Sequence, residues 1–227
     1  PKPLIVRGAR QVGKTVAIKM FAQENFKNFI YLNLEKNDDA RLFERIIPIS
    51  DLIQAIELKT GQKITTKESI IFIDEIQNSI PAMTQLRYFY EDTPGLHVMA
   101  AGSLLEVKLK QEGFSFPVGR VEYIYMHPVT FEEFLEANKE TQIIEYIRQW
   151  NHQISIPEEI HQTLIKKYME YLLVGGMPQA VASYVERKNL LELETIYPDF
   201  DSMQVCERGR SSGSKRSRIC SAPEVKK

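Results

Sequence analysis

The chain has 227 residues, of which 43% are hydrophobic and 26% charged, a composition typical of a folded globular protein. The sequence contains no run of eighteen apolar residues, so we expect no membrane-spanning segment. The net charge of −1 is unevenly distributed, because residues 207–227 carry seven Lys or Arg and two Glu, which gives +5 and leaves −6 for the remainder.

Short strand-like and helix-like segments alternate through the first part of the chain. Apolar runs and alternating patterns predict five strands, at residues 3–8, 28–35, 69–74, 96–103 and 121–130. Apolar residues at helical spacing predict helices at residues 14–24, 38–46, 50–60, 81–92, 131–138, 141–150, 156–176 and 177–197.

This order of elements predicts the fold class and the domains. Strands that alternate with helices are typical of an α/β fold with a parallel sheet flanked by helices. After about residue 139 the predicted strands stop and only helices follow. We therefore expect an α/β core over residues 1–139, a small helical domain over residues 140–200, and a basic tail over residues 201–227 that is disordered or artefactual in origin.

The segment GARQVGKT fits the pattern G-x-x-x-x-G-K-[ST] of a phosphate-binding loop. It follows a predicted strand and precedes a predicted helix, as such a loop requires. We expect Lys14 to reach the β- and γ-phosphates, Thr15 to be a Mg²⁺ ligand, and the helix to direct its positive end at the anion. The residues expected to bind ATP are Gly8, Ala9, Arg10, Gln11, Val12, Gly13, Lys14, Thr15 and Val16.

An acidic pair, Asp74 and Glu75, ends the most continuous apolar strand. An Asp in that place can hold Mg²⁺ through a water, and the adjacent Glu can polarise a water for attack on the γ-phosphate. Such a pair can also be an ordinary solvated turn. Because a phosphate loop needs an acidic partner, the sequence favours a Mg²⁺ site at Asp74 and a catalytic base at Glu75.

Two further kinds of residue can contact the transferred phosphate. Ser103 ends the fourth predicted strand, where it is either a contact to the γ-phosphate or attacking water or a plain turn residue. An arginine often stabilises the charge of the transition state. The candidates, each of which spacing alone explains more readily as a surface charge, are Arg7, Arg10, Arg87 and Arg120.

The chain resembles the prokaryotic AAA-type P-loop ATPases that carry a C-terminal domain of unknown function. The matching segments, in chain order, are GARQVGKT (8–15), YLNLE (31–35), IFIDEIQ (71–77), AAGSLLEVKL (100–109), VGRVEYIYMHPVTFEEFL (118–135) and YLLVGGMPQAV (171–181). The resemblance also indicates that this chain is truncated at both ends.

The resemblance has consequences for the fold and the site. It implies an AAA+ or STAND-like core in which the strand before Ser103 lies between the strands of the phosphate loop and the acidic pair. Ser103 would then be a sensor of the γ-phosphate, and Arg120 a γ-phosphate or inter-subunit arginine. The helical domain would be winged-helix-like, and the GGMP segment (175–178) is more readily explained as a turn between helices than as a second ligand site.

These observations favour a cytoplasmic ATPase that hydrolyses Mg-ATP and couples nucleotide state to its C-terminal domain. Placement in the cytoplasm is also the expectation from Cys206 and Cys220, which match no metal-binding spacing and are too few for a disulfide framework. One alternative is a nucleotide-dependent switch with little hydrolysis, which binds DNA or a partner protein; another is a small-molecule kinase. A homo-oligomer is compatible with the sequence.

Overall fold

The computed structural model describes residues 1–103, 119–151 and 155–188. Its five strands form one sheet in the order β2-β3-β4-β1-β5, and every neighbouring pair is parallel. The strands are β1 (Leu4–Arg7), β2 (Asn28–Asn33), β3 (Ser69–Asp74), β4 (His97–Gly102) and β5 (Glu122–Tyr125). The parallel α/β fold expected from the sequence is therefore confirmed.

The helices are α1 (Lys14–Asn25), α2 (Asn37–Ala40), α3 (Ile49–Thr60), α4 (Ile80–Asp92), α6 (Phe131–Ala137), α7 (Thr141–Gln149), α8 (Glu158–Val174) and α9 (Pro178–Arg187), with short 3₁₀ helices η1 (Arg41–Phe43) and η2 (Ile76–Asn78). The single helix expected over residues 38–46 is instead α2 followed by η1. Residues 189–197 of the last predicted helix, the tail over residues 201–227 and both cysteines lie outside the described residues.

Helices cover both faces of the sheet, and the alternation of side chains along the strands explains how. On one face Ile71 and Ile73 of β3 pack with Leu52 of α3 and Leu86 of α4. On the other face Phe72, between them in sequence, packs with α1. All six residues of β3 are buried, as expected for a parallel strand covered on both sides.

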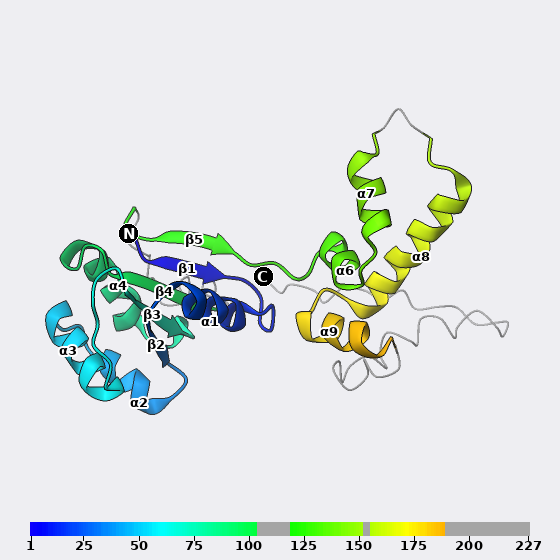
Figure 1. Ribbon diagram of the computed structural model, residues 1–227. Helices are drawn as coiled ribbons and strands as arrows, with labels where there is room; N and C mark the ends of the chain where they lie inside the picture. Colours follow the sequence, from blue (N-terminus) through cyan, green and yellow to red (C-terminus); the bar gives the residue numbers. More distant parts are fainter. Residues whose placement is uncertain (104–118, 152–154, 189–227) are drawn as a thin grey trace, which may run out of the picture.

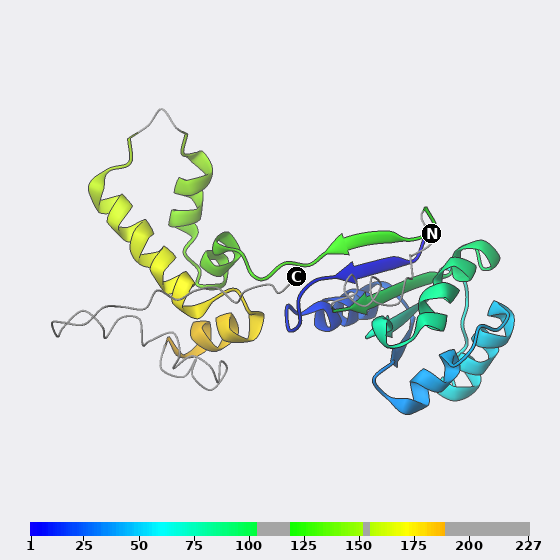
Figure 2. The same ribbon diagram turned by 180° about the vertical axis from the view of Figure 1, so that it is seen from behind.

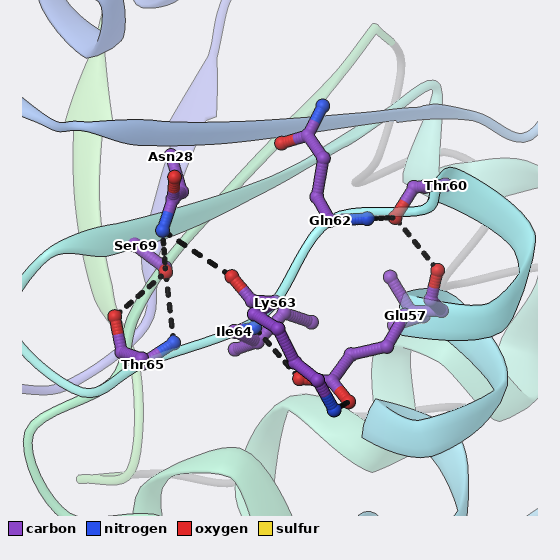
Figure 3. A network of polar contacts seen from close by, with 9 residues as sticks. Asn28, Glu57, Thr60, Gln62, Lys63, Ile64, Thr65 and Ser69 are labelled. Carbon is purple, nitrogen blue, oxygen red and sulfur yellow. Dashed lines mark hydrogen bonds and ion pairs between the residues drawn. The ribbon is translucent and has the colours of Figure 1, made fainter.

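A polar network fixes the amino edge of the sheet, the edge at which the strands begin. Ser69 at the start of β3 accepts hydrogen bonds through its hydroxyl from the N–H of Thr65 at 2.9 Å and from the amide of Asn28 at 3.3 Å (Figure 3). Nearby, the Glu57 carboxylate accepts the Ile64 N–H at 2.7 Å, and this bond lowers the pKa of Glu57. The connection from α3 to β3 is thus attached to the sheet at its amino edge.

The helices α6 to α9 lie beyond the carboxyl ends of the strands, on the side to which the arrows of β1 and β5 point (Figure 1), and the opposite view in Figure 2 agrees. Their small core consists of Phe134, Val174, Ala180, Val181 and Tyr184. Residues 140–151 and 155–188 form helices and connections without a strand. Phe134 belongs to α6, so this helix, which the sequence groups with the α/β core, packs in the helical part.

None of the helices in the described ranges combines the length and the hydropathy that a bilayer crossing demands.

Candidate functional site

The loop from Gly8 to Gly13 joins β1 to α1 and requires unusual backbone conformations. Its residues Gly8, Gln11 and Gly13 have φ of 148°, 64° and 91°. Positive φ is strained for a residue with a side chain, and such strain at Gln11 is typical of functional loops. Gly13 also begins α1, because its carbonyl accepts the Ala17 N–H at 2.9 Å. The loop therefore wraps the N-terminus of α1, where backbone N–H groups favour an anion.

Lys14 lies inside this loop with only 7% of its surface exposed. Its ammonium donates hydrogen bonds to the carbonyl oxygens of Gly8 at 3.0 Å and Ala9 at 2.6 Å. Burial lowers the pKa of Lys14, and the nearby carboxylates of Glu75 and Asp74 oppose that shift. The loop thus carries a largely desolvated cation, whose attraction to a phosphate is stronger than it would be in water.

Thr15 and Asp74 meet at the carboxyl edge of the sheet, as the sequence predicts. The Thr15 hydroxyl donates to Asp74 Oδ2 at 2.9 Å, and the Glu75 N–H donates to Oδ1 at 3.1 Å. Asp74 is 4% exposed. A hydroxyl and a carboxylate, both hard oxygen donors, are suitable ligands for Mg²⁺ when most of its remaining positions are filled by water and phosphate.

Glu75 follows directly, with a left-handed backbone of φ 53°. Gln77, which lies in η2 and is buried, donates a side-chain hydrogen bond to the Glu75 carboxylate. The strained backbone and this bond together hold Glu75 at the cleft described below, which it lines. In the sequence Gln77 marks only the family resemblance, and its contact with Glu75 was not predicted.

Ser103 lies at the same edge, directly after β4, and is buried. The strand order places β4 between β3, which carries the acidic pair, and β1, which carries the loop. Gly102 is in register with Arg7, so Ser103 stands beside the start of the loop. This is the arrangement that the family resemblance implies for a sensor residue, and the sensor role itself stays a prediction.

Arg120 is at the opposite edge of the sheet. It precedes β5, and it donates a hydrogen bond to the Glu91 carboxylate at 2.7 Å at the end of α4. Its guanidinium lowers the pKa of Glu91. Because parallel strands place their starting ends at one edge and their carboxyl ends at the other, Arg120 does not reach the site of its own chain. The expected γ-phosphate role within one chain is therefore not supported, and the inter-subunit role stays a prediction.

The other three candidate arginines lie at different places in the fold. Arg10 lines the cleft, whereas Arg87 pairs with Glu91 at 3.0 Å near Arg120. The guanidinium carbon of Arg7 lies 3.8 Å from the ring centroid of Tyr123 in β5.

A cleft of about 700 Å³ lies over the loop. This volume is in the range of small-molecule sites. Its lining residues come from the loop and α1, from the two acidic segments after β2 and β3, and from α9: Arg10, Gln11, Gly13, Lys14, Thr15, Val16, Glu35, Glu75, Pro178 and Gln179. Pro178 and Gln179 follow the Gly-Gly turn, so this segment contributes to the same cleft rather than to a turn alone. The one signal in the sequence for a role of the GGMP segment in the cleft was its occurrence among the family motifs.

The segment after β5 contacts both the loop and the Gly-Gly turn. The Met126 N–H donates to the Arg7 carbonyl at 2.8 Å, and a Cβ on Gly8 would lie 2.2 Å from the Met126 carbonyl oxygen. Three residues later, the Val129 N–H donates to the Gly176 carbonyl at 2.8 Å, and a Cβ on Gly176 would lie 2.7 Å from the Val129 oxygen. We name residues 126–129 the connecting segment, because at both contacts only a glycine allows this approach.

The fold and the phosphate loop define a P-loop domain of the AAA type. The family described as an AAA domain matches residues 1–135, more than half of the sequence, and the chain belongs to this family. Comparison with curated proteins gave no match.

Two solved structures are similar in fold at low sequence identity. The Drosophila ORC, in a structure bound to DNA, has a TM-score of 0.47 and 12% identity, over 98% of this chain and 65% of that one. The C. elegans PCH-2 has a TM-score of 0.44 and 13% identity, over 89% of this chain and 61% of that one. The present chain thus spans less than two thirds of the length of either protein.

Two glycine substitutions in the loop test the close approach of the connecting segment. Gly8→Ala and Gly13→Ala both add a methyl group at positive φ, which costs roughly 1–3 kcal/mol of stability in each case. Only the methyl group at Gly8 meets backbone, at 2.2 Å, whereas the nearest atom to the one at Gly13 is a side-chain methyl at 3.7 Å. We expect Gly8→Ala to lower the free energy of unfolding in urea by roughly a further 1–3 kcal/mol. Equal losses in the two variants would contradict the described contact.

Proposed function

We propose that the protein binds Mg-ATP at this cleft and hydrolyses it to ADP and phosphate. The observation that carries the proposal is the hydrogen bond of 2.9 Å between Thr15 and Asp74, which joins the phosphate loop to the acidic strand. It joins a pair of oxygens suited to Mg²⁺ at the edge of the sheet where the buried Lys14 and Glu75 also lie. The phosphate loop alone could simply bind an anion, and the acidic strand end alone could simply bind a cation. Only the two together suggest a hydrolase.

Each residue of the site has its own role in binding or hydrolysis. The Lys14 ammonium and the N–H groups at the start of α1 bind the β- and γ-phosphates and offset their charge. Thr15 and Asp74 would hold Mg²⁺, which supplies further neutralisation of charge on the phosphate oxygens. Glu75 orients a water and accepts its proton as the oxygen attacks the γ-phosphorus, while the bond to the β–γ bridging oxygen breaks. Ser103, which lies beside the start of the loop, would contact the γ-phosphate.

We propose further that nucleotide state is coupled to the helical part of the chain. Two connections support this. Pro178 and Gln179 at the start of α9 line the nucleotide cleft. The connecting segment contacts Gly8 of the loop and Gly176 of the turn before α9, with no space for a side chain at either residue. Because these contacts leave no free space, a displacement of the loop would move the connecting segment and, with it, the start of α9.

A switch with little hydrolysis is the second candidate, and the hydrogen bond from Gln77 to the Glu75 carboxylate favours it. The bond occupies a carboxylate oxygen that would otherwise be available to accept the proton of the attacking water. In this case occupancy of the cleft would control binding of DNA or a partner protein. The charge of −6 outside residues 207–227 does not favour extended DNA contact, because binding to the phosphate backbone needs a basic surface.

Phosphate release by the purified protein tests the proposed function and separates the two candidates. We expect Glu75→Gln to slow release by roughly a hundredfold or more while ATP affinity is retained, because only proton transfer is lost. Glu24→Gln, the same change at an exposed position of α1, is the control and should leave the rate unchanged. A rate that persists in Glu75→Gln would show that the base is wrongly assigned, and tight binding without release by the native chain would favour the switch.

A glycine substitution tests the coupling. Gly176→Ala would place a methyl group 2.7 Å from the Val129 oxygen and should displace the start of α9 from the cleft. We expect ATP affinity, measured by titration calorimetry, to fall by roughly tenfold as contacts with Pro178 and Gln179 are lost. Gly61→Ala, at φ 67° with nothing within 4 Å, costs stability but should leave affinity unchanged. Equal affinities in Gly176→Ala and the native protein would exclude the coupling.

A further inference from the structure

The Asp74 carboxylate receives a hydrogen bond from a residue outside the expected site. The Tyr31 hydroxyl donates to Asp74 Oδ2 at 3.0 Å. This is the same oxygen that accepts the Thr15 hydroxyl at 2.9 Å. Nothing in the phosphate-loop or acidic-strand pattern predicts a tyrosine there.

The pairing of β2 with β3 explains how Tyr31 reaches the carboxylate. Tyr31 is in register with Phe72, and Asn33 is in register with Asp74, so Tyr31 is two residues short of Asp74 along the parallel pair. Residues two apart in a strand point to the same face. A tyrosine is long enough to span that separation, with its ring beside Phe72 and its hydroxyl at Asp74.

The ring of Tyr31 is held on several sides. Its centroid lies 5.4 Å from that of Phe72 and 6.3 Å from that of Phe29. The Lys19 ammonium from α1 lies 3.8 Å from the ring centroid, in a cation–π contact. The hydroxyl is therefore presented to Asp74 by a ring that strands and α1 already fix.

This arrangement gives the two donors on Asp74 Oδ2 different tasks. Thr15 is the residue whose oxygen would also contact the metal, so its hydroxyl must serve both the ion and the carboxylate. Tyr31 approaches from β2 and needs only to bind Asp74. Its hydrogen bond, with that of the Glu75 N–H to Oδ1, fixes both carboxylate oxygens without any contribution from the nucleotide.

We propose that Tyr31 is a positioning residue of the Mg²⁺ site, which holds the Asp74 carboxylate in the orientation that receives the ion. The proposal rests on the proposed function, in which Thr15 and Asp74 hold Mg²⁺. The strand β2, at the edge of the sheet, would thereby contribute to Mg²⁺ binding.

The experiment is a titration of Mg²⁺ into the whole chain with a fluorescent ATP analogue, for the native protein and for Tyr31→Phe. This change keeps the ring and its contacts and removes only the hydroxyl. We expect the Mg²⁺ concentration that half-restores tight binding to rise by roughly tenfold, since a hydrogen bond to a charged group is lost. Affinity for the analogue in excess chelator, which excludes the metal, should be unchanged.

Tyr184→Phe is the matched control. It removes a tyrosine hydroxyl that donates to the Glu170 carboxylate at 3.3 Å between α9 and α8, away from the connecting segment, and it should leave the Mg²⁺ requirement at the native value. Unfolding of all three proteins in urea establishes that each is folded at the start of the titration.

The outcomes distinguish the proposal from the function on which it rests. A native Mg²⁺ requirement in Tyr31→Phe, with metal-dependent binding by the native chain, would overturn the positioning role alone. Equal losses with and without metal would also overturn it, because the hydroxyl would then support the loop in general. If the native chain binds the analogue with no dependence on Mg²⁺, the assignment of Thr15 and Asp74 fails instead.

Discussion

The burial of two opposite charges at one edge of the sheet is the constraint on which the rest of the site depends. Lys14 is 7% and Asp74 is 4% exposed, and a buried charge is costly unless it is paired and hydrogen-bonded. The chain meets this requirement with loop carbonyls for Lys14 and with hydroxyl and N–H donors for Asp74. The donors to Asp74 come from α1, β2 and the residue after β3, so this charge is tolerated only where these elements come together.

The same requirement explains where the backbone is strained. The Lys14 ammonium can reach the Gly8 and Ala9 carbonyls only if the loop turns back over α1, which needs positive φ at Gly8, Gln11 and Gly13. Gly8 then lies so near the connecting segment that no side chain fits. Through this segment the loop contacts the turn before α9. The connecting segment therefore links the geometry of the loop to the position of the helical part.

The sequence was sufficient to predict features that depend on local patterns. Periodicity and spacing were enough to predict the buried strand β3 and the loop at Gly8–Thr15. They also predicted the acidic pair at the carboxyl end of β3. Features set by long-range contacts were not predicted. Arg120 was a candidate because an arginine often stabilises the transition state and because the family resemblance includes it, but a residue before a parallel strand lies at the edge opposite the loop. Tyr31 resembles any alternating strand residue, and its bond to Asp74 depends on the register of β2 with β3.

The contribution of α9 to the cleft was missed for the same reason. Pro178 is far from Gly13 in the sequence, and only the folded chain brings the Pro178 ring to within 3.8 Å of a Cβ built on Gly13. The resemblance to AAA-type ATPases contained the Gly-Gly-x-Pro motif but gave no geometry for it. The motif is now explained by two contacts, the close approach of Gly176 to Val129 and the place of Pro178 in the cleft.

Whether the buried Lys14 ammonium binds the phosphates is tested by the affinity for ATP in the absence of metal, measured by calorimetry for the native chain, Lys14→Ala and Lys27→Ala. Lys14 is the buried cation of the loop, whereas Lys27 is exposed and pairs with Glu68. We expect a loss of roughly a hundredfold or more in Lys14→Ala, because the charge-assisted bonds to two phosphates are removed, and no change in Lys27→Ala. Native affinity in Lys14→Ala would instead show that the phosphates bind elsewhere.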